Sequence, residues 1–344
     1  MKFQYVLGIE TSCDDTSCAI VDHKGFVKAV VYANQDSVHK PFGGIVPEIA
    51  SRNHSAHLLP MIDATLKKAN LKMDDISGIA VTNRPGLLGS LLVGVVTAKS
   101  LALALKKPFI GVHHIEGHIM APFLSDETYS APAHWQWPFL SLVVSGGHTS
   151  LFKVSEFGNY KLLGATIDDA AGEAFDKFAK MVGLGYPGGV QVDKLSQSGN
   201  VKAFEFPRAL IRENNFDFSF SGLKTAAHRV LESLGAEEVQ KRLSDLCASY
   251  QEAIVDVLFD KTMRAAREHN ISCVSVTGGV SANTRLREKF LSAKDVQVAI
   301  PPLRFCTDNA AMIALTGMKY LEKGVSSNQT LGALARAELG GNHG

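Results

Sequence analysis

Residues 5–21 read YVLGIETSCDDTSCAIV, and this stretch decides the fold class. An apolar strand runs into a turn of small, hydroxyl and acidic residues, a second strand returns over residues 17–21, and a third is predicted at residues 26–32. A turn of this kind can approach a phosphate through its backbone N–H groups. A plain polar hairpin turn is the alternative for this stretch taken alone.

The same pattern returns at residues 139–154, which read FLSLVVSGGHTSLFKV, with a third strand predicted at residues 160–167. Another turn of small residues, TGGVSAN at residues 277–283, follows the apolar strand that begins at residue 273. Helical patterns separate these strands, so we expect an α/β protein with two duplicated mixed sheets flanked by helices. Turns of this type in both lobes would wrap a nucleotide-like ligand.

Residues 113–118, HHIEGH, open a predicted helix at the end of a short buried strand at residues 109–112. His114 and His118 are four residues apart and therefore share one helix face. Two imidazoles so placed can bind zinc or iron, and two partly buried histidines with ordinary hydrogen bonds are the alternative. A zinc-protease role is excluded, because Glu116 points about 200° away from His114 at roughly 100° per residue.

Asp308 stands at the start of a predicted helix in residues 301–314. It can be the N-cap of that helix, which is the ordinary use of an aspartate there. It can also be an anionic third ligand beside two histidines.

The composition is that of an ordinary globular protein: 344 residues, 46% hydrophobic and 20% charged, with a net charge of +1. Bulk charge therefore neither requires nor excludes nucleic acid. Its five cysteines form no Cys-x-x-Cys and no disulfide framework, and the N-terminus does not resemble a signal peptide. The apolar run at residues 87–105 carries Lys99, so no membrane span is expected. Together with the cysteine pattern, this favours a reducing cytoplasm.

A cluster of basic residues lies around residues 208–229. Its members are Arg208, Arg212, Lys224, His228 and Arg229. They can contact phosphates, or they can form a solvated basic face.

Seven motifs, in order along nearly the whole chain, together resemble those of the TsaD family, whose older names are Gcp and O-sialoglycoprotein endopeptidase. They are IETSCD at 9–14, VHHIEGH at 112–118, VSGGHT at 144–149, YPGG at 186–189, FSFSGLK at 218–224, GGVSAN at 278–283 and FCTDN at 305–309. The resemblance implies an actin-like, sugar-kinase-type (ASKHA) fold of two lobes. The first would span residues 1–135, completed by a C-terminal helix at about residues 309–338, and the second residues 136–308.

The resemblance also implies an activity: transfer of threonylcarbamoyl from threonylcarbamoyl-AMP to N6 of the adenosine 3′ of the anticodon in tRNAs that read ANN codons. It implies one divalent metal held by His114, His118 and Asp308, with Fe²⁺ named first and Zn²⁺ as the alternative. Asp14 and Asp15 are the candidate catalytic bases. The substrate-binding residues it implies are Val144, Ser145, Gly146, Gly147, His148, Asp176, Gly189, Asp193 and Asn283.

By the same resemblance the partners are tRNA, a TsaB-like heterodimer partner, a TsaE-like ATPase and a TsaC-like enzyme that supplies threonylcarbamoyl-AMP, with ATP and Mg²⁺ as a further requirement of the complex. Two residues depart from the family pattern: Asp15 stands where glutamate is common, and Arg84 where glycine is common. Arg84 adds charge and bulk at this turn, and contact with tRNA or a partner is one use for it. The competing functions are a non-catalytic actin-like scaffold and a small-molecule kinase.

Overall fold

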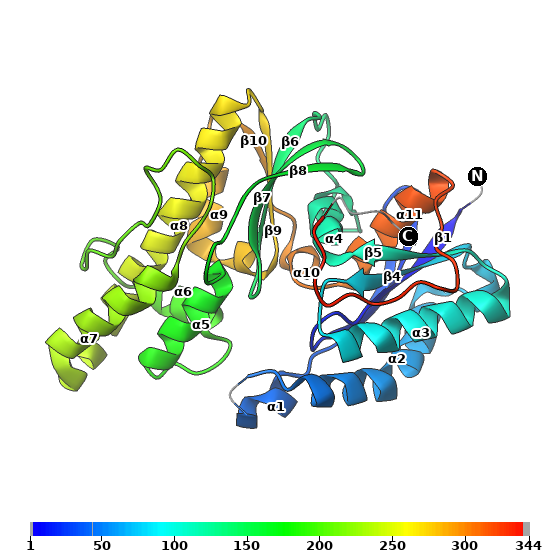
Figure 1. The fold of residues 1–344 in the computed structure, drawn as a ribbon, viewed down its shortest axis with the longest axis horizontal. Coiled ribbons are helices and arrows are strands. Elements are labelled where there is room, and N and C mark those ends of the chain that lie inside the picture. Colours follow the sequence, from blue (N-terminus) through cyan, green and yellow to red (C-terminus); the bar gives the residue numbers. More distant parts are fainter. Residues whose placement is uncertain (1–2, 43, 340–344) are drawn as a thin grey trace. The chain divides into compact units, whose positions relative to one another are not determined.

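The computed structural model describes residues 3–42 and 44–339 (Figure 1). The chain divides into two compact units, residues 1–133 with 304–344, and residues 134–303. Residues 304–308 group with the first unit, in which Arg304 donates to both carboxylate oxygens of Asp126 at 2.6 and 2.8 Å.

The first unit is built on a five-stranded mixed sheet in the order β3-β2-β1-β4-β5. Strands β1 (Tyr5–Glu10), β2 (Thr16–Asp22) and β3 (Val27–Ala33) form the predicted antiparallel meander. Strands β4 (Gly78–Arg84) and β5 (Phe109–His113) extend it in parallel on the other side of β1.

Helices pack on this sheet, as the apolar patterns predict (Figure 1). Helices α2 (Pro47–Ala69) and α3 (Leu88–Leu105) contact each other, α2 packs on β2 and β3, and α3 packs on β4. Helix α11 (Ala310–Glu322) packs on β1, β2 and β4. Helix α3 is long and apolar enough to cross a membrane, but core helices of globular proteins also meet these two criteria. One third of its residues are buried within the unit.

The second unit repeats the first sheet. Strands β6 (Phe139–Val144), β7 (Thr149–Glu156) and β8 (Asn159–Ala165) form an antiparallel meander, and β9 (Cys273–Thr277) and β10 (Gln297–Ala299) run parallel to β6. The order of the second sheet is β10-β9-β6-β7-β8. Read in reverse, β8-β7-β6-β9-β10, it matches the order β3-β2-β1-β4-β5 of the first sheet strand for strand. The predicted duplication is confirmed.

A helical layer builds the core of the second unit. It comprises α5 (Ala171–Met181), α6 (Gly188–Ser196), α7 (Ser221–Lys241), α8 (Leu243–Glu268) and α9 (Thr284–Leu291). Helix α8 is buried along most of its length, and the rings of Phe178 and Tyr250 stack with centroids 4.0 Å apart. The short helices α1 (Asp36–His39), α4 (His114–Met120) and α10 (Leu303–Cys306) complete the chain.

Candidate functional site

Helix α4 follows β5 without a loop, so both histidines stand at the end of a parallel strand. His113 is the N-cap: its Nδ1 accepts from the N–H of Ile115 at 3.2 Å. His114 and His118 are buried, and their Nε2 atoms lie 3.2 Å apart. The predicted placement of the two rings on one face is confirmed.

Asp308 completes a group of three. Its Oδ1 lies 3.3 Å from Nε2 of His114 and 3.2 Å from Nε2 of His118. The N-cap of α11 is the next residue, Asn309, whose Oδ1 accepts from the N–H of Met312 at 3.0 Å. The N-cap interpretation of Asp308 is therefore wrong, and its carboxylate faces the histidines.

The spacing of these three atoms fits a metal ion. A four-coordinate ion with bonds of about 2.05 Å has ligand atoms about 3.3 Å apart. The three described distances, 3.2, 3.3 and 3.2 Å, agree with that edge length. Two imidazole nitrogens and one carboxylate oxygen form a donor set that suits zinc or iron and leaves further coordination positions open.

Glu10, the last residue of β1, supports the group from behind. Its buried carboxylate accepts from the N–H of Ser12 at 2.6 Å and from the hydroxyl of Thr82 at 2.6 Å. Its Oε2 lies 3.0 Å from Nδ1 of His114. A carboxylate at Nδ1 holds the proton on that nitrogen and leaves Nε2 free to bind a metal.

Sequence reasoning missed Glu10. The available signal was an acidic residue that ends an otherwise apolar strand. With Asp308 it gives the site two carboxylates, which calls for compensating positive charge.

The pKa values of these residues are shifted by burial and by the charges of their neighbours. Burial lowers the pKa of His114, but the charges of Asp308 and Glu10 outweigh it and raise that pKa well above its ordinary value. Burial lowers the pKa of His118. Burial raises the pKa of Asp308, yet the charge of His114 and hydrogen bonds from both histidines bring it well below its usual range.

The first turn, which carries Asp14 and Asp15, lies in the same unit. The hydroxyl of Ser12 is 3.2 Å from Nδ1 of His114, which places the start of this turn beside the group of His114, His118 and Asp308. Asp15 is held from β3: it accepts from the hydroxyl of Tyr32 and from Nδ2 of Asn34, the latter at 3.2 Å.

His54, which sequence reasoning did not select, anchors this turn from α2. It is fully buried, its Nδ1 lies 2.7 Å from the hydroxyl of Thr16, and its Nε2 lies 3.0 Å from the carbonyl oxygen of Cys13. Burial lowers the pKa of His54, so its neutral form holds the turn at neutral pH.

A pocket of about 330 Å³ lies within the second unit. Five of the predicted substrate residues line it: Gly146, Asp176, Gly189, Asp193 and Asn283. The liners that sequence reasoning missed are Gly172, Phe175, Pro187, Val190, Gly279, Val280, Ala282 and Leu303. The pocket combines apolar walls with a few polar groups, as small-molecule sites do.

The other predicted residues, Val144, Ser145, Gly147 and His148, are not among the liners. They form the turn beside the pocket, where the N–H of Ser145 donates to the carbonyl of His148 at 2.8 Å. Gly172 lets α5 begin against this turn, since a Cβ there would lie 2.6 Å from the carbonyl oxygen of Ser145. The turn thus closes one side of the pocket.

The polar groups of the pocket already have protein partners. Asp176 accepts from the N–H of Gly188 at 2.8 Å, and burial raises its pKa. Asp193 accepts from the N–H and the hydroxyl of Thr284 at 3.1 and 2.9 Å. The Oδ1 of Asn283 accepts from the N–H of Leu286 at 3.0 Å and caps α9. These bonds fix the three side chains in place.

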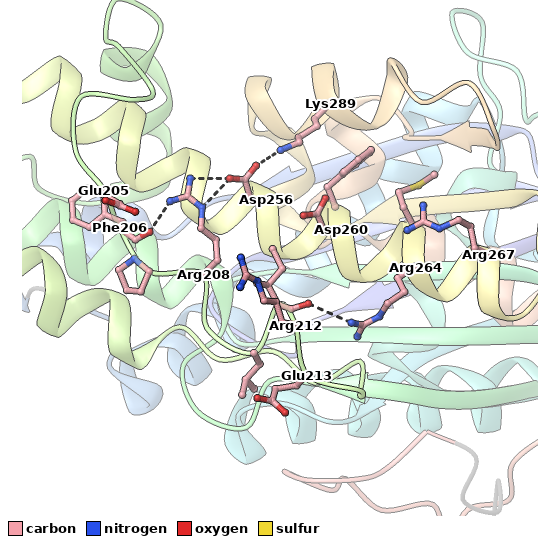
Figure 2. A pocket seen from close by; sticks show the side chains of 15 residues that line it. Glu205, Phe206, Arg208, Arg212, Glu213, Asp256, Asp260, Arg264, Arg267 and Lys289 are labelled. Carbon is pink, nitrogen blue, oxygen red and sulfur yellow. Dashed lines mark hydrogen bonds and ion pairs between the residues drawn. The ribbon is translucent and has the colours of Figure 1, made fainter.

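A larger cavity, of about 1280 Å³, lies between α8 and the loop that contains Arg208 and Arg212. In Figure 2, Arg208 and Lys289 both form ion pairs with Asp256. Arg208 donates to Asp256 at 2.9 and 2.8 Å and to the carbonyl of Phe206 at 2.6 Å. Asp256 also binds Lys289. Arg208 therefore serves the fold. Carboxylates line this cavity as well as cations, so its lining is not the purely basic one of a phosphate site.

The chain is similar to proteins of one family over its length. The model of the TsaD family, described as tRNA N6-adenosine threonylcarbamoyltransferase, matches residues 27–315. A protein of that name from Bdellovibrio bacteriovorus is 57% identical to this chain, and the match covers 96% of this chain and 97% of the relative. A second, from an Anaeromyxobacter species, is 49% identical, and the match covers 95% of this chain and 98% of the relative.

Solved structures of much lower identity show the same fold. The T. kodakarensis HypF structure covers 93% of this chain and 48% of its own, with a TM-score of 0.63 at 13% identity. Component A of the (R)-2-hydroxyglutaryl-CoA dehydratase of Acidaminococcus fermentans covers 93% and 99%, with a TM-score of 0.54 at 15% identity. The expected actin-like ATPase fold is confirmed.

Proposed function

This chain belongs to the TsaD family, and from that premise we propose that it is a tRNA N6-adenosine threonylcarbamoyltransferase. It takes threonylcarbamoyl from threonylcarbamoyl-AMP and places it on N6 of the adenosine 3′ of the anticodon in tRNAs that read ANN codons. The observation that carries this proposal is the group of His114, His118 and Asp308, backed by the buried carboxylate of Glu10.

His114, His118 and Asp308 would hold one divalent metal, Fe²⁺ or Zn²⁺. When bound, such an ion supplies Lewis-acid polarisation of a carbonyl oxygen. Glu10 keeps His114 in the tautomer that presents Nε2. The burial of both histidines keeps water from the ligand nitrogens.

A carboxylate of the first turn is the proposed base. The adenine N6 attacks the carbamoyl carbon, a C–N bond forms, the bond from that carbon to the phosphate oxygen breaks, and AMP leaves. The exocyclic amine is a weak nucleophile, so removal of its proton by Asp14 or Asp15 assists the step. Tyr32 and Asn34 orient Asp15 from the adjacent strand.

The pocket of the second unit would take the AMP part. Phe175, Val190 and Val280 give it apolar surface for a base, and Asp176 and Asp193 give it carboxylates for ribose hydroxyls. The turn at residues 144–148 would hold the phosphate through its backbone N–H groups. The target adenosine has to leave its stack in the anticodon loop, at a cost of a few kcal/mol.

We assign the TsaB-like partner to the apolar surface formed by Leu59, Leu88, Leu92, Val96 and Leu103, which we call the α2/α3 face. These side chains are between 43% and 69% exposed and come from two adjacent helices. Several exposed apolar side chains on two helices that pack together favour a protein interface at this face. The TsaE-like ATPase, the TsaC-like enzyme, the use of ATP and Mg²⁺ and a cytoplasmic location are parts of the same proposal.

The competing functions each lack support from this site. A non-catalytic scaffold has no use for two buried histidines and a carboxylate converging within 3.3 Å. A small-molecule kinase binds Mg²⁺ through oxygen ligands, whereas two of these three donors are imidazoles.

The test is transfer of labelled threonylcarbamoyl from threonylcarbamoyl-AMP to an ANN-decoding tRNA, with the purified protein and its partners, before and after chelation. We expect label on the tRNA that chelation removes and added metal restores. Full transfer by a His114→Ala, His118→Ala double variant would refute the metal assignment. ATP turnover with a small acceptor and no tRNA would favour the kinase.

A further inference from the structure

Glu116 and Tyr320 form a buried hydrogen bond behind the metal centre. The phenol of Tyr320 donates to Oε1 of Glu116 at 2.5 Å. Both side chains are buried, Glu116 completely. Glu116 is two residues from each histidine of α4, so at roughly 100° per residue it leaves the helix on the side away from both rings.

Arg84, the last residue of β4, completes this polar group. It is 5% exposed, so the expectation that it faces tRNA or a partner is wrong. Burial lowers the pKa of Arg84, and the charge of Glu116 opposes that shift. Burial, followed by the charge of Glu116, raises the pKa of Tyr320, so the phenol keeps its proton and stays the donor. We call Arg84, Glu116 and Tyr320 the rear cluster.

The rear cluster joins the elements that carry the ligands. Helix α4 supplies His114 and His118, and Asp308 directly precedes the N-cap of α11, the helix of Tyr320. Between these points α4 lies close against α11. A Cβ on Gly117 would be 2.8 Å from Cδ1 of Ile313 and 3.0 Å from Cγ of Met312.

Helix α4 has only seven residues, too few for a helix to be stable by itself. Its rotation about its own axis is therefore set by contacts with its neighbours. On one side the imidazoles meet Asp308, and on the other the carboxylate of Glu116 meets Tyr320. A small rotation would move both Nε2 atoms, because the rings project from the axis.

We propose that Glu116 and Tyr320 are positioning residues of the metal centre: their hydrogen bond holds α4 against α11 so that His114, His118 and Asp308 converge. Arg84 supplies a positive charge that interacts with the negative charge of Glu116. This inference rests on the proposed function, since it assigns the rear cluster a role toward the metal.

The test measures Co²⁺ affinity of the full-length, metal-stripped protein by ligand-field absorption, beside its thermal midpoint. Tyr320→Phe removes only the hydroxyl. Tyr250→Phe is the matched control, since Tyr250 is also buried, donates to a backbone carbonyl at 3.1 Å and lies in the other unit. We expect Tyr320→Phe to weaken Co²⁺ binding by about 10- to 100-fold, the usual effect of an outer-shell partner, while Tyr250→Phe leaves it unchanged.

A second pair of variants covers the charge. Glu116→Gln removes one negative charge that interacts with Arg84 and is expected to lose both stability and Co²⁺ affinity. The double variant Glu116→Gln, Arg84→Met restores the charge balance, and we expect it to regain stability but not affinity, because an amide is a weaker acceptor for the phenol.

Two results would overturn the proposal. One is unchanged Co²⁺ affinity in Tyr320→Phe, and the other is a loss of affinity in Tyr250→Phe that matches that of Tyr320→Phe. Wild-type Co²⁺ affinity in His114→Ala, His118→Ala would instead show that the metal centre itself is misassigned. The failure of the proposed function is thereby told apart from failure of the rear cluster.

Discussion

Oε2 of Glu10 lies 3.0 Å from Nδ1 of His114, although the two residues are 104 positions apart in the chain. The contact joins the end of β1 to the start of α4 inside the first unit. It fixes the orientation of the His114 ring, as an outer-shell carboxylate does for a metal-binding histidine.

The first prediction concerns this contact. Glu10→Gln keeps the shape but removes the negative charge behind His114, so we expect metal affinity to fall by about 10- to 100-fold. Metal content after dialysis against a graded series of chelator concentrations measures it. Metal retention equal to that of the wild type would show that Glu10 stabilises only the end of β1 and not the metal site.

The second prediction separates two neighbouring residues. Asp308→Asn should abolish tight metal binding and transfer, because it removes the only anionic ligand of the group. Asn309→Ala removes the cap of α11 and should cost about 1 kcal/mol of stability while metal stays bound. Metal content and urea unfolding of both variants check this. Metal retained in Asp308→Asn and lost in Asn309→Ala would contradict the site.

The third prediction concerns the first turn. If Asp14 or Asp15 is the base, its change to asparagine should lower the transfer rate by about 10²- to 10⁴-fold with metal content unchanged. Asp15→Glu restores the residue common in the family and should retain transfer. Single-turnover transfer at saturating tRNA is the measurement. Full rates in both asparagine variants would exclude a carboxylate base in this turn.

The fourth prediction concerns the α2/α3 face. Leu92→Asp with Val96→Asp places two charges on it and should abolish the heterodimer without unfolding the chain, since both side chains are exposed, at 43% and 56%. Leu162→Asp is the control, because Leu162 is 52% exposed on β8 of the other unit. Light scattering of mixtures with the purified partner measures assembly. A heterodimer that survives the double change would move the interface elsewhere.

The fifth prediction is a pH dependence. Lys261 on α8 is fully buried and donates to the carbonyl and the side-chain oxygen of Asn215 at 3.1 and 3.2 Å. Burial, followed by the charge of Arg264, lowers its pKa from 10.5 to about 8. Below pH 8 the folded protein therefore carries the full cost of the buried charge, on the order of 3 kcal/mol.

Between pH 8 and 10.5 the unfolded chain binds more protons at Lys261 than the folded one, so the free energy of unfolding rises with pH over this range. Lys261→Met has no such proton and should lack this rise. Urea unfolding at intervals from pH 7.5 to pH 10 gives the difference between the two proteins. Parallel curves would contradict the lowered pKa.

The sequence by itself determined the features that rest on local patterns. The two meanders follow from strand–turn–strand runs of a few residues each, and the shared face of His114 and His118 follows from their four-residue spacing. The motifs that resemble the TsaD family are likewise short, contiguous stretches. Each depends on neighbours along the chain, so no knowledge of packing was needed.

Only the tertiary structure decided which distant groups meet. In the structure Asn309 caps α11, so Asp308 can contact His114 and His118. Arg84 is buried, and its charge interacts with that of Glu116. The tertiary structure also brought Glu10 to His114, and Asp308 to a histidine 190 residues away. These choices depend on how β1, α4 and α11 pack against one another, and the free energy of that packing comes from many side chains at once, so no single stretch of sequence encodes it.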